Sequence, residues 1–237
     1  MPEVKVCVRA IYFMRRQLQA RGVVLRVACT WKIFLNIYPS GAALRNKRLM
    51  NIVFIGMSGS GKSTFAKYCA DLLNMPIIDL DSEICRKYGG SIPAIFAAGG
   101  EKLFRELELN EAIEAANASG AIIATGGGTV TQKDAMLALK KSGLVVHLNC
   151  DLQTLVDRLS GANDDRPLLE TDSLAETLQK MLDERERLYY EYADVVLNET
   201  DVLKSRNIEN APLCDQLGAL YLELVLKLEK KVYAKFK

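Results

Sequence analysis

The segment Gly56–Thr64 constrains the fold of this chain more than any other part of its sequence. It reads Gly-Met-Ser-Gly-Ser-Gly-Lys-Ser-Thr, which has the phosphate-loop form G-x-x-x-x-G-K-[ST]. The apolar run Asn51–Ile55 before it predicts a buried strand, and the apolar spacing after it predicts a helix. A loop between such a strand and helix turns backbone N–H groups toward an anion, so we expect it to bind a nucleoside triphosphate. A plain Gly/Ser turn with a solvated lysine is the less favoured alternative.

The residues of this loop have different expected tasks. Lys62 would reach the β- and γ-phosphates, and the hydroxyl of Ser63 would ligate Mg²⁺. The triphosphate would lie against the whole loop, that is against Gly59, Ser60, Gly61, Lys62, Ser63 and Thr64.

Charge is distributed unevenly along the 237 residues, whose net charge is only +2. Residues 1–50 hold ten of the 31 Lys and Arg residues and one of the 29 Asp and Glu residues, a net charge of +9. The remainder therefore has a net charge of −7, which argues against a nucleic-acid partner for the body. Six cysteines without a C-x-x-C pair indicate free thiols in a reducing cytoplasm.

Residues 1–49 form a basic leader without a clear helical or strand period, and we expect it to be disordered. Its apolar run at 22–38 contains Arg26 and Lys32, so it is too short and too charged to span a membrane. The composition leaves two interpretations open. The leader is either a transit peptide, which would direct the chain to a plastid, or a spurious or disposable extension before a true start at Met50.

From residue 50 onward, apolar runs alternate with helical patterns, which predicts repeated β-α units around a parallel sheet. The expected strands are 51–56, 76–79, 121–125, 144–148 and 194–198. The expected helices are 62–73, 101–118, 132–141, 152–159, 174–191 and 213–234.

Polar and small residues follow two of these strands at their carboxyl ends, where open α/β sheets bind ligands. Asp79 and Asp81 would share one direction if the second strand continued through both, with one assisting Mg²⁺ and the other accepting a proton from a hydroxyl. Helix capping is an equally favoured role for such an aspartate. Three glycines, 126–128, follow the third strand and would let the backbone approach a ligand closely, unless they form a simple turn.

Arginines are the remaining candidates, because a guanidinium can hold a carboxylate or phosphate with two parallel hydrogen bonds. Those singled out are Arg105, Arg158, Arg166 and Arg185. Arg105 lies between Glu101 and Glu108, so a helix-surface ion pair is its alternative role. The only histidine, His147, falls within an apolar run and is expected to be a core residue.

The order and spacing of these motifs closely resemble the shikimate kinase family over residues 50–200. The resemblance is carried by the phosphate loop and by Asp79-x-Asp81, Gly90-Ser-Ile-x-x-Ile-Phe96, Gly100-Glu-x-x-Phe-Arg-x-x-Glu108, Thr125-Gly-Gly-Gly128, Arg166-Pro-Leu-Leu169 and Arg185-x-x-x-Tyr189. It implies an α/β, three-layer P-loop fold of the nucleoside-monophosphate-kinase type, with a five-stranded parallel sheet in the order 2-3-1-4-5 flanked by helices. It also implies transfer of the γ-phosphoryl group of ATP to the 3-hydroxyl of shikimate, a step toward aromatic amino acids.

Site roles follow from the same resemblance. Asp81, Arg105, Gly126, Gly127, Gly128 and Arg185 are assigned to shikimate, with Asp81 at the ring hydroxyls and the two arginines at the carboxylate. Lys62, Asp81 and Arg166 are assigned to catalysis, and Ser63 and Asp79 to Mg²⁺. Arg158 is assigned to the adenine, although its spacing to Arg166 is one residue longer than in some relatives. The implied segments are a substrate-binding region at about 80–110, a lid at about 158–172 and a final helix at about 213–234.

The implied enzyme is a cytoplasmic monomer with no nucleic-acid or membrane partner. Two other hypotheses remain open from the sequence. One is a different small-molecule kinase of this fold, such as a nucleotide or gluconate kinase, which would not need two arginines for an acceptor carboxylate. The other is a nucleotide-binding regulatory module without turnover.

Overall fold

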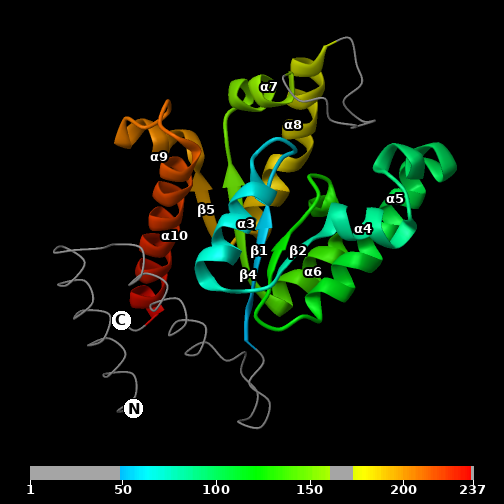
Figure 1. The fold of residues 1–237 in the computed structure, drawn as a ribbon, viewed down its shortest axis with the longest axis horizontal. Coiled ribbons are helices and arrows are strands. Elements are labelled where there is room, and N and C mark those ends of the chain that lie inside the picture. The colour runs from blue at the N-terminus through cyan, green and yellow to red at the C-terminus, as the bar shows by residue number, and fades with distance from the viewer. Residues whose placement is uncertain (1–48, 161–172, 236–237) are drawn as a thin grey trace, which may run out of the picture. The chain divides into compact units, whose positions relative to one another are not determined.

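The computed structural model describes residues 49–160 and 173–235, so all of the leader except residue 49 lies outside them. Five strands form one parallel sheet in the order β2-β3-β1-β4-β5, as expected. The strands are β1 (Asn51–Ile55), β2 (Ile77–Asp79), β3 (Ile122–Ala124), β4 (Gly143–Asn149) and β5 (Val195–Asn198). Met50–Lys237 forms one compact unit around this sheet (Figure 1).

Helices cover both faces of the sheet, because side chains of β1 alternate between them. Val53 and Ile55 pack in a buried cluster with Met136 of α6 (Lys133–Ser142) and Leu178 of α8 (Leu174–Tyr192). Phe54 points to the opposite face, where its ring meets Phe65 of α3 (Lys62–Leu73) at 5.2 Å. The result is the three-layer α/β arrangement that the sequence predicted.

Two helices were not predicted, and one begins earlier than expected. The two are α4 (Leu80–Tyr88) and α9 (Glu199–Arg206). Helix α5 (Ile92–Ala116) begins nine residues before the expected start at 101 and is kinked at Gly100, whose φ is 66°. The expected helix corresponds to the part of α5 after this kink. The remaining helices are α7 (Leu152–Ser160) and α10 (Leu213–Lys235), with a 3₁₀ turn, η1 (Thr129–Thr131), after β3.

Helix α10 runs beside β5 at one edge of the sheet (Figure 1). The ammonium groups of Lys227 and Lys231 donate hydrogen bonds to the carbonyl oxygens of Val196 and Asp194, at 2.9 and 2.7 Å. An uncovered edge strand would offer these carbonyls to another chain, so the helix protects the sheet edge. Within the described residues, no helix is both long enough and apolar enough to cross a lipid bilayer.

Candidate active site

The phosphate loop lies between the end of β1 and the start of α3, at the carboxyl edge of the sheet. Gly59 and Gly61 adopt φ values of 82° and 80°, which favour glycine because it lacks a Cβ atom. Helix α3 has no side-chain cap at its N-terminus, so its first N–H groups face the loop cavity. Lys62 is buried and donates a hydrogen bond from Nζ to the carbonyl oxygen of Met57 at 2.7 Å. The loop therefore presents an anion site with its lysine already folded back over it.

Asp79 connects this loop to the second strand. Its Oδ2 accepts a hydrogen bond from the Ser63 hydroxyl at 2.6 Å, while Oδ1 accepts one from the backbone N–H of Ser82 at 3.0 Å. The aspartate is thus the N-cap of α4 and also a neighbour of the proposed metal-ligating hydroxyl. The capping role considered from the sequence is confirmed, and the contact with Ser63 is compatible with the predicted metal role.

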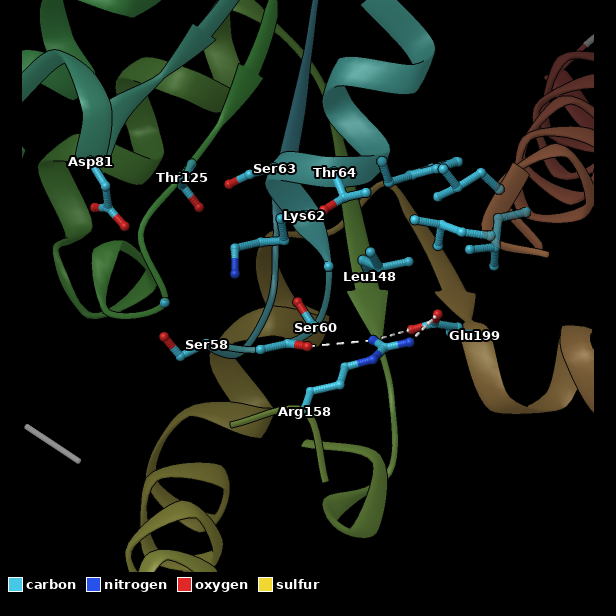
Figure 2. A pocket seen from close by; sticks show the side chains of 17 residues that line it. Ser58, Ser60, Lys62, Ser63, Thr64, Asp81, Thr125, Leu148, Arg158 and Glu199 are labelled. Atoms are coloured by element: carbon cyan, nitrogen blue, oxygen red, sulfur yellow. Dashed lines mark hydrogen bonds and ion pairs between the residues drawn. The ribbon is translucent and has the colours of Figure 1, made fainter. Parts of the chain in front are cut away.

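Asp79 and Asp81 do not share one direction along a strand, because the condition for it, a strand that continues through both residues, is not met. The strand ends at Asp79 and α4 begins at Leu80, so the two carboxylates do not alternate along one strand. Asp81 instead lies in the first turn of α4, from which it still lines the same cavity as the phosphate loop (Figure 2). Because β2 ends at Asp79, the first turn of α4 carries Asp81 to the edge of this cavity.

The three glycines after β3 let other parts of the site approach their backbone. A Cβ atom at Gly126 would lie 2.9 Å from Oδ1 of Asp81, and one at Gly127 would lie 2.9 Å from the backbone nitrogen of Ser58. A Cβ atom at Gly128 would collide with the guanidinium of Arg105. The glycine segment is therefore the meeting point of α4, the phosphate loop and α5, and a side chain at any of these positions would displace one of them.

Arg105 is held by two carboxylates rather than exposed on the surface of α5. Its Nη1 donates to Oε2 of Glu108 at 2.6 Å, and its Nη2 donates to Oε1 of Glu101 at 3.0 Å. Glu108 is completely buried and also accepts hydrogen bonds from Thr129 at 2.6 Å and Gln132 at 2.7 Å. The roles of Thr129 and Gln132 were not predicted, because their position shortly after the glycines was the only sequence signal that they carry.

Arg185 and Tyr189 approach the same glycines from α8. The Tyr189 hydroxyl donates to the carbonyl oxygen of Gly127 at 2.6 Å, and Nη1 of Arg185 donates to that oxygen at 3.4 Å. Nε of Arg185 is buried and has no hydrogen-bond partner among the described residues. Arg187, two positions along the helix, is exposed. Arg105 and Arg185 therefore both lie against the glycine segment, although they come from different helices.

His147 packs behind the site. Its ring is 2% exposed and stacks on Tyr189 with the ring centroids 4.8 Å apart. Burial, and secondly the charge of Lys62, lowers the pKa of this imidazole to about 4. The expectation that His147 is a core residue is confirmed.

Arg158 lies at the other end of the cavity, near the end of α7. Its Nη1 and Nη2 donate to the two carboxylate oxygens of Glu199 at 2.9 and 2.7 Å, and Nη1 lies 3.4 Å from the carbonyl oxygen of Gly59 (Figure 2). Glu199 was not singled out from the sequence, because its helix was not predicted. The expected base-binding arginine is thus fixed by a partner 41 residues away.

The phosphate loop, Asp81 and Arg158 line a common cavity of about 320 Å³. One end is polar and is lined by the phosphate loop, Asp81, Thr125 and Gly127. The other end is lined by Arg158 and Glu199 together with apolar side chains, namely Leu148, Leu213, Leu217 and Leu220. Figure 2 shows Asp81 and Glu199 at opposite ends, with Lys62 between them. Arg166 and the lid segment 161–172 lie outside the described residues.

A phosphate loop at the carboxyl edge of a parallel sheet of this order, beside a second polar site, defines a P-loop kinase. The shikimate kinase family model matches residues 58–211. A shikimate kinase of Pseudomonas syringae pv. tomato is 40% identical over 153 residues, covering 65% of this chain and 88% of the relative. One from Sulfurihydrogenibium is 37% identical over 161 residues, covering 68% and 95%. The chain therefore belongs to the shikimate kinase family and is a phosphotransferase.

Solved structures agree with this assignment. A shikimate kinase from Acinetobacter baumannii in complex with shikimate gives a TM-score of 0.64 at 32% identity, covering 79% of this chain and 94% of the other. One from Bacteroides thetaiotaomicron gives 0.66 at 31% identity, covering 76% and 98%. The predicted family and fold are confirmed.

Proposed function

We propose that this enzyme transfers the γ-phosphoryl group of ATP to the 3-hydroxyl of shikimate, in the biosynthesis of aromatic amino acids. The observation that carries the proposal is the glycine segment 126–128, against which Asp81, Arg105 and Arg185 all lie beside the phosphate loop. A small acceptor with one carboxylate and several hydroxyls matches this set of side chains. Family membership supplies the acceptor, and the arrangement of the side chains supports it.

The acceptor end would work as a carboxylate clamp. Two guanidinium groups from α5 and α8 can each present parallel N–H donors to one carboxylate. The buried Glu108 restricts Arg105, and the hydrogen bond from Tyr189 fixes the Gly127 carbonyl beside Arg185. Asp81 would then bind the ring hydroxyls, orient the reacting hydroxyl and accept its proton.

The phosphate end would neutralise charge on the transferred group. Loop N–H groups and Lys62 would bind the phosphates, and the side chains at the metal position fit a magnesium ion, since a hydroxyl and a carboxylate oxygen lie 2.6 Å apart there. Mg²⁺ bound to ATP would offset the negative charge of the transferred phosphoryl group. Arg166 would add a further positive charge from the lid, as the family resemblance implies.

The base end would hold the adenine. Its lining combines leucine side chains with the Arg158 guanidinium, which suits the faces of an aromatic base better than a phosphate. We propose that the enzyme acts as a cytoplasmic monomer without a nucleic-acid or membrane partner. We also propose that residues 50–237 form the catalytic domain and that the leader 1–49 takes no part in catalysis.

An acceptor comparison tests this function. The purified chain is assayed with ATP and Mg²⁺ against shikimate, gluconate and nucleoside monophosphates, with ADP release measured by a coupled assay. Only shikimate should support rapid turnover, and phosphorus NMR should place the phosphate on the 3-hydroxyl. Faster turnover with another acceptor, or tight ATP binding without turnover, would contradict the proposal.

A further inference from the structure

The ion pair between Arg158 and Glu199 lies inside the nucleotide cavity rather than on the outer surface. Both residues line the cavity, and the Glu199 side chain is only 8% exposed while that of Arg158 is 35% exposed. We propose that Glu199 is a positioning residue for the nucleotide base, which acts by fixing Arg158 as one wall of the base site. The inference rests on the proposed function, in which Arg158 contacts the adenine.

The geometry immobilises the guanidinium. Two of its nitrogens donate to the two oxygens of one carboxylate, and a third contact joins Nη1 to the phosphate-loop carbonyl of Gly59. A two-pronged pair of this kind fixes the plane of the guanidinium as well as its position. Hydrogen bonds of this kind form at the edge of a guanidinium and do not use its faces, on which aromatic groups stack.

Glu199 is itself well anchored. It is the first residue of α9, where the helix dipole favours a carboxylate, and it directly follows the edge strand β5. The adjoining residue Asn198 accepts a hydrogen bond from Asn149 of β4 at 3.3 Å. The carboxylate is therefore fixed by the sheet, and through it the sheet determines the position of Arg158.

A fixed arginine face affects base binding in two ways. A long side chain that is already ordered loses less conformational freedom when the base arrives, so more of the stacking energy appears as affinity. The carboxylate also balances the arginine charge, so this end of the cavity does not compete with the phosphate loop for phosphates. Leu213, Leu217 and Leu220 of α10 add apolar side chains to the lining of the same cavity.

If the pair between Arg158 and Glu199 had only a structural role, its loss would affect the binding of different ligands than a positioning role would. If the ion pair only tied α7 to α9, its loss would disturb the neighbouring phosphate loop as well, and all ligands of the cavity would bind more weakly. A positioning role affects only ligands that carry a base. ADP and inorganic tripolyphosphate separate these possibilities, because tripolyphosphate occupies the phosphate end without a base.

The test measures the affinities of ADP and tripolyphosphate by calorimetry for the full chain and for Glu199→Gln, which keeps the side-chain size but removes the charge. We expect ADP to bind about 3- to 10-fold more weakly, with tripolyphosphate unchanged or tighter. The KM for ATP should rise while kcat and the KM for shikimate stay the same. The matched control is Asp201→Asn, an exposed acid in the same helix turn that does not line the cavity.

A second variant separates this inference from the proposed function. Arg158→Ala should weaken ADP binding but not tripolyphosphate binding, and adding Glu199→Gln to it should cause no further loss. If Glu199→Gln leaves ADP binding unchanged, or weakens both ligands equally, the positioning role is wrong even though shikimate turnover stands. If the unmodified enzyme fails to phosphorylate shikimate, the proposed function is wrong whatever the ADP measurements show.

Discussion

The hydroxyl of Ser63 and the carboxylate of Asp79 lie 2.6 Å apart, which joins the phosphate loop to the end of the neighbouring strand. These are the two side chains assigned to Mg²⁺, and they come from α3 and the N-cap of α4. Their contact means that a metal ion at the phosphate loop would meet a hydroxyl and a carboxylate that are already adjacent.

The first prediction concerns this pair. Asp79→Asn should raise the Mg²⁺ concentration needed for half-maximal rate, because a neutral amide attracts the cation less than a carboxylate does. The substitution should leave α4 intact, since Asn caps helices as well as Asp does. Asp71→Asn on the exposed face of α3 is the control. An unchanged magnesium dependence of the rate would remove Asp79 from the metal site.

The second prediction concerns Lys62. Lys62→Met keeps a long side chain but removes the cation that we propose to lie nearest the transferred phosphoryl group, so kcat should fall by about two to three orders of magnitude. The melting temperature should change little. Steady-state kinetics and thermal unfolding measure the two effects, and near-normal turnover would contradict the assignment of the phosphate loop.

The sequence predicted the sheet and the strand-loop-helix arrangement of the phosphate loop well, because both depend on local patterns. Buried parallel strands appear as short apolar runs, and the phosphate loop is a continuous motif. Helix α9 escaped prediction because its two buried apolar side chains, Val202 and Leu203, are adjacent and form no helical stripe. Helix α4 was missed because its first residues were considered only as a continuation of the second strand or as a cap, although it buries Leu80 and Ile84 four residues apart.

Partners that are distant in sequence could not be predicted in the same way. Glu199 contacts Arg158 only after β4 and β5 pair, and no local pattern encodes that contact. Arg105 and Glu108 are close in sequence, yet only the fold distinguishes a surface ion pair from a buried network that includes Thr129. Asp81 lines the same cavity as the phosphate loop, but it does so from the first turn of a helix rather than from a continued strand.

The third prediction concerns the leader. A chain that begins at Met50 should be as active and as heat-stable as the full chain, because β1 starts at Asn51 and the motifs of the site all follow it. Assays and melting curves of the two forms provide the comparison. A large drop in melting temperature on truncation would show that residues 1–49 stabilise the body.

The fourth prediction uses the lowered pKa of His147. The folded state binds this proton with a pKa of about 4, whereas an unfolded chain binds it near the ordinary value of about 6.5. As pH falls below about 6.5, the unfolded state gains protons that the folded state does not, so the free energy of unfolding decreases until about pH 4. The loss attributable to this group between pH 7.5 and 5 is about 2 kcal/mol.

Urea unfolding at several pH values tests this contribution. His147→Phe keeps an aromatic ring to stack on Tyr189 but cannot take up the proton, so its stability should change less between pH 7.5 and 5. No other histidine is present to obscure the comparison. If the free energy of unfolding depends on pH in the same way for both proteins, His147 does not contribute to the pH dependence of stability.

The last prediction tests the acceptor clamp through Arg185. Its Nη1 lies 3.4 Å from the Gly127 carbonyl, and its Nε has no partner among the described residues, so it can receive a carboxylate. Arg185→Ala leaves that carboxylate with half its clamp, at a cost of about 2–5 kcal/mol, so the KM for shikimate should rise at least about 30-fold. ADP affinity without acceptor should hardly change.

Arg185→Lys should restore only part of the loss, because an ammonium keeps the charge but not the two-pronged geometry. The exposed Arg187 gives the control, and if Arg187→Ala is the damaging change while Arg185→Ala is silent, the clamp has been assigned to the wrong residue.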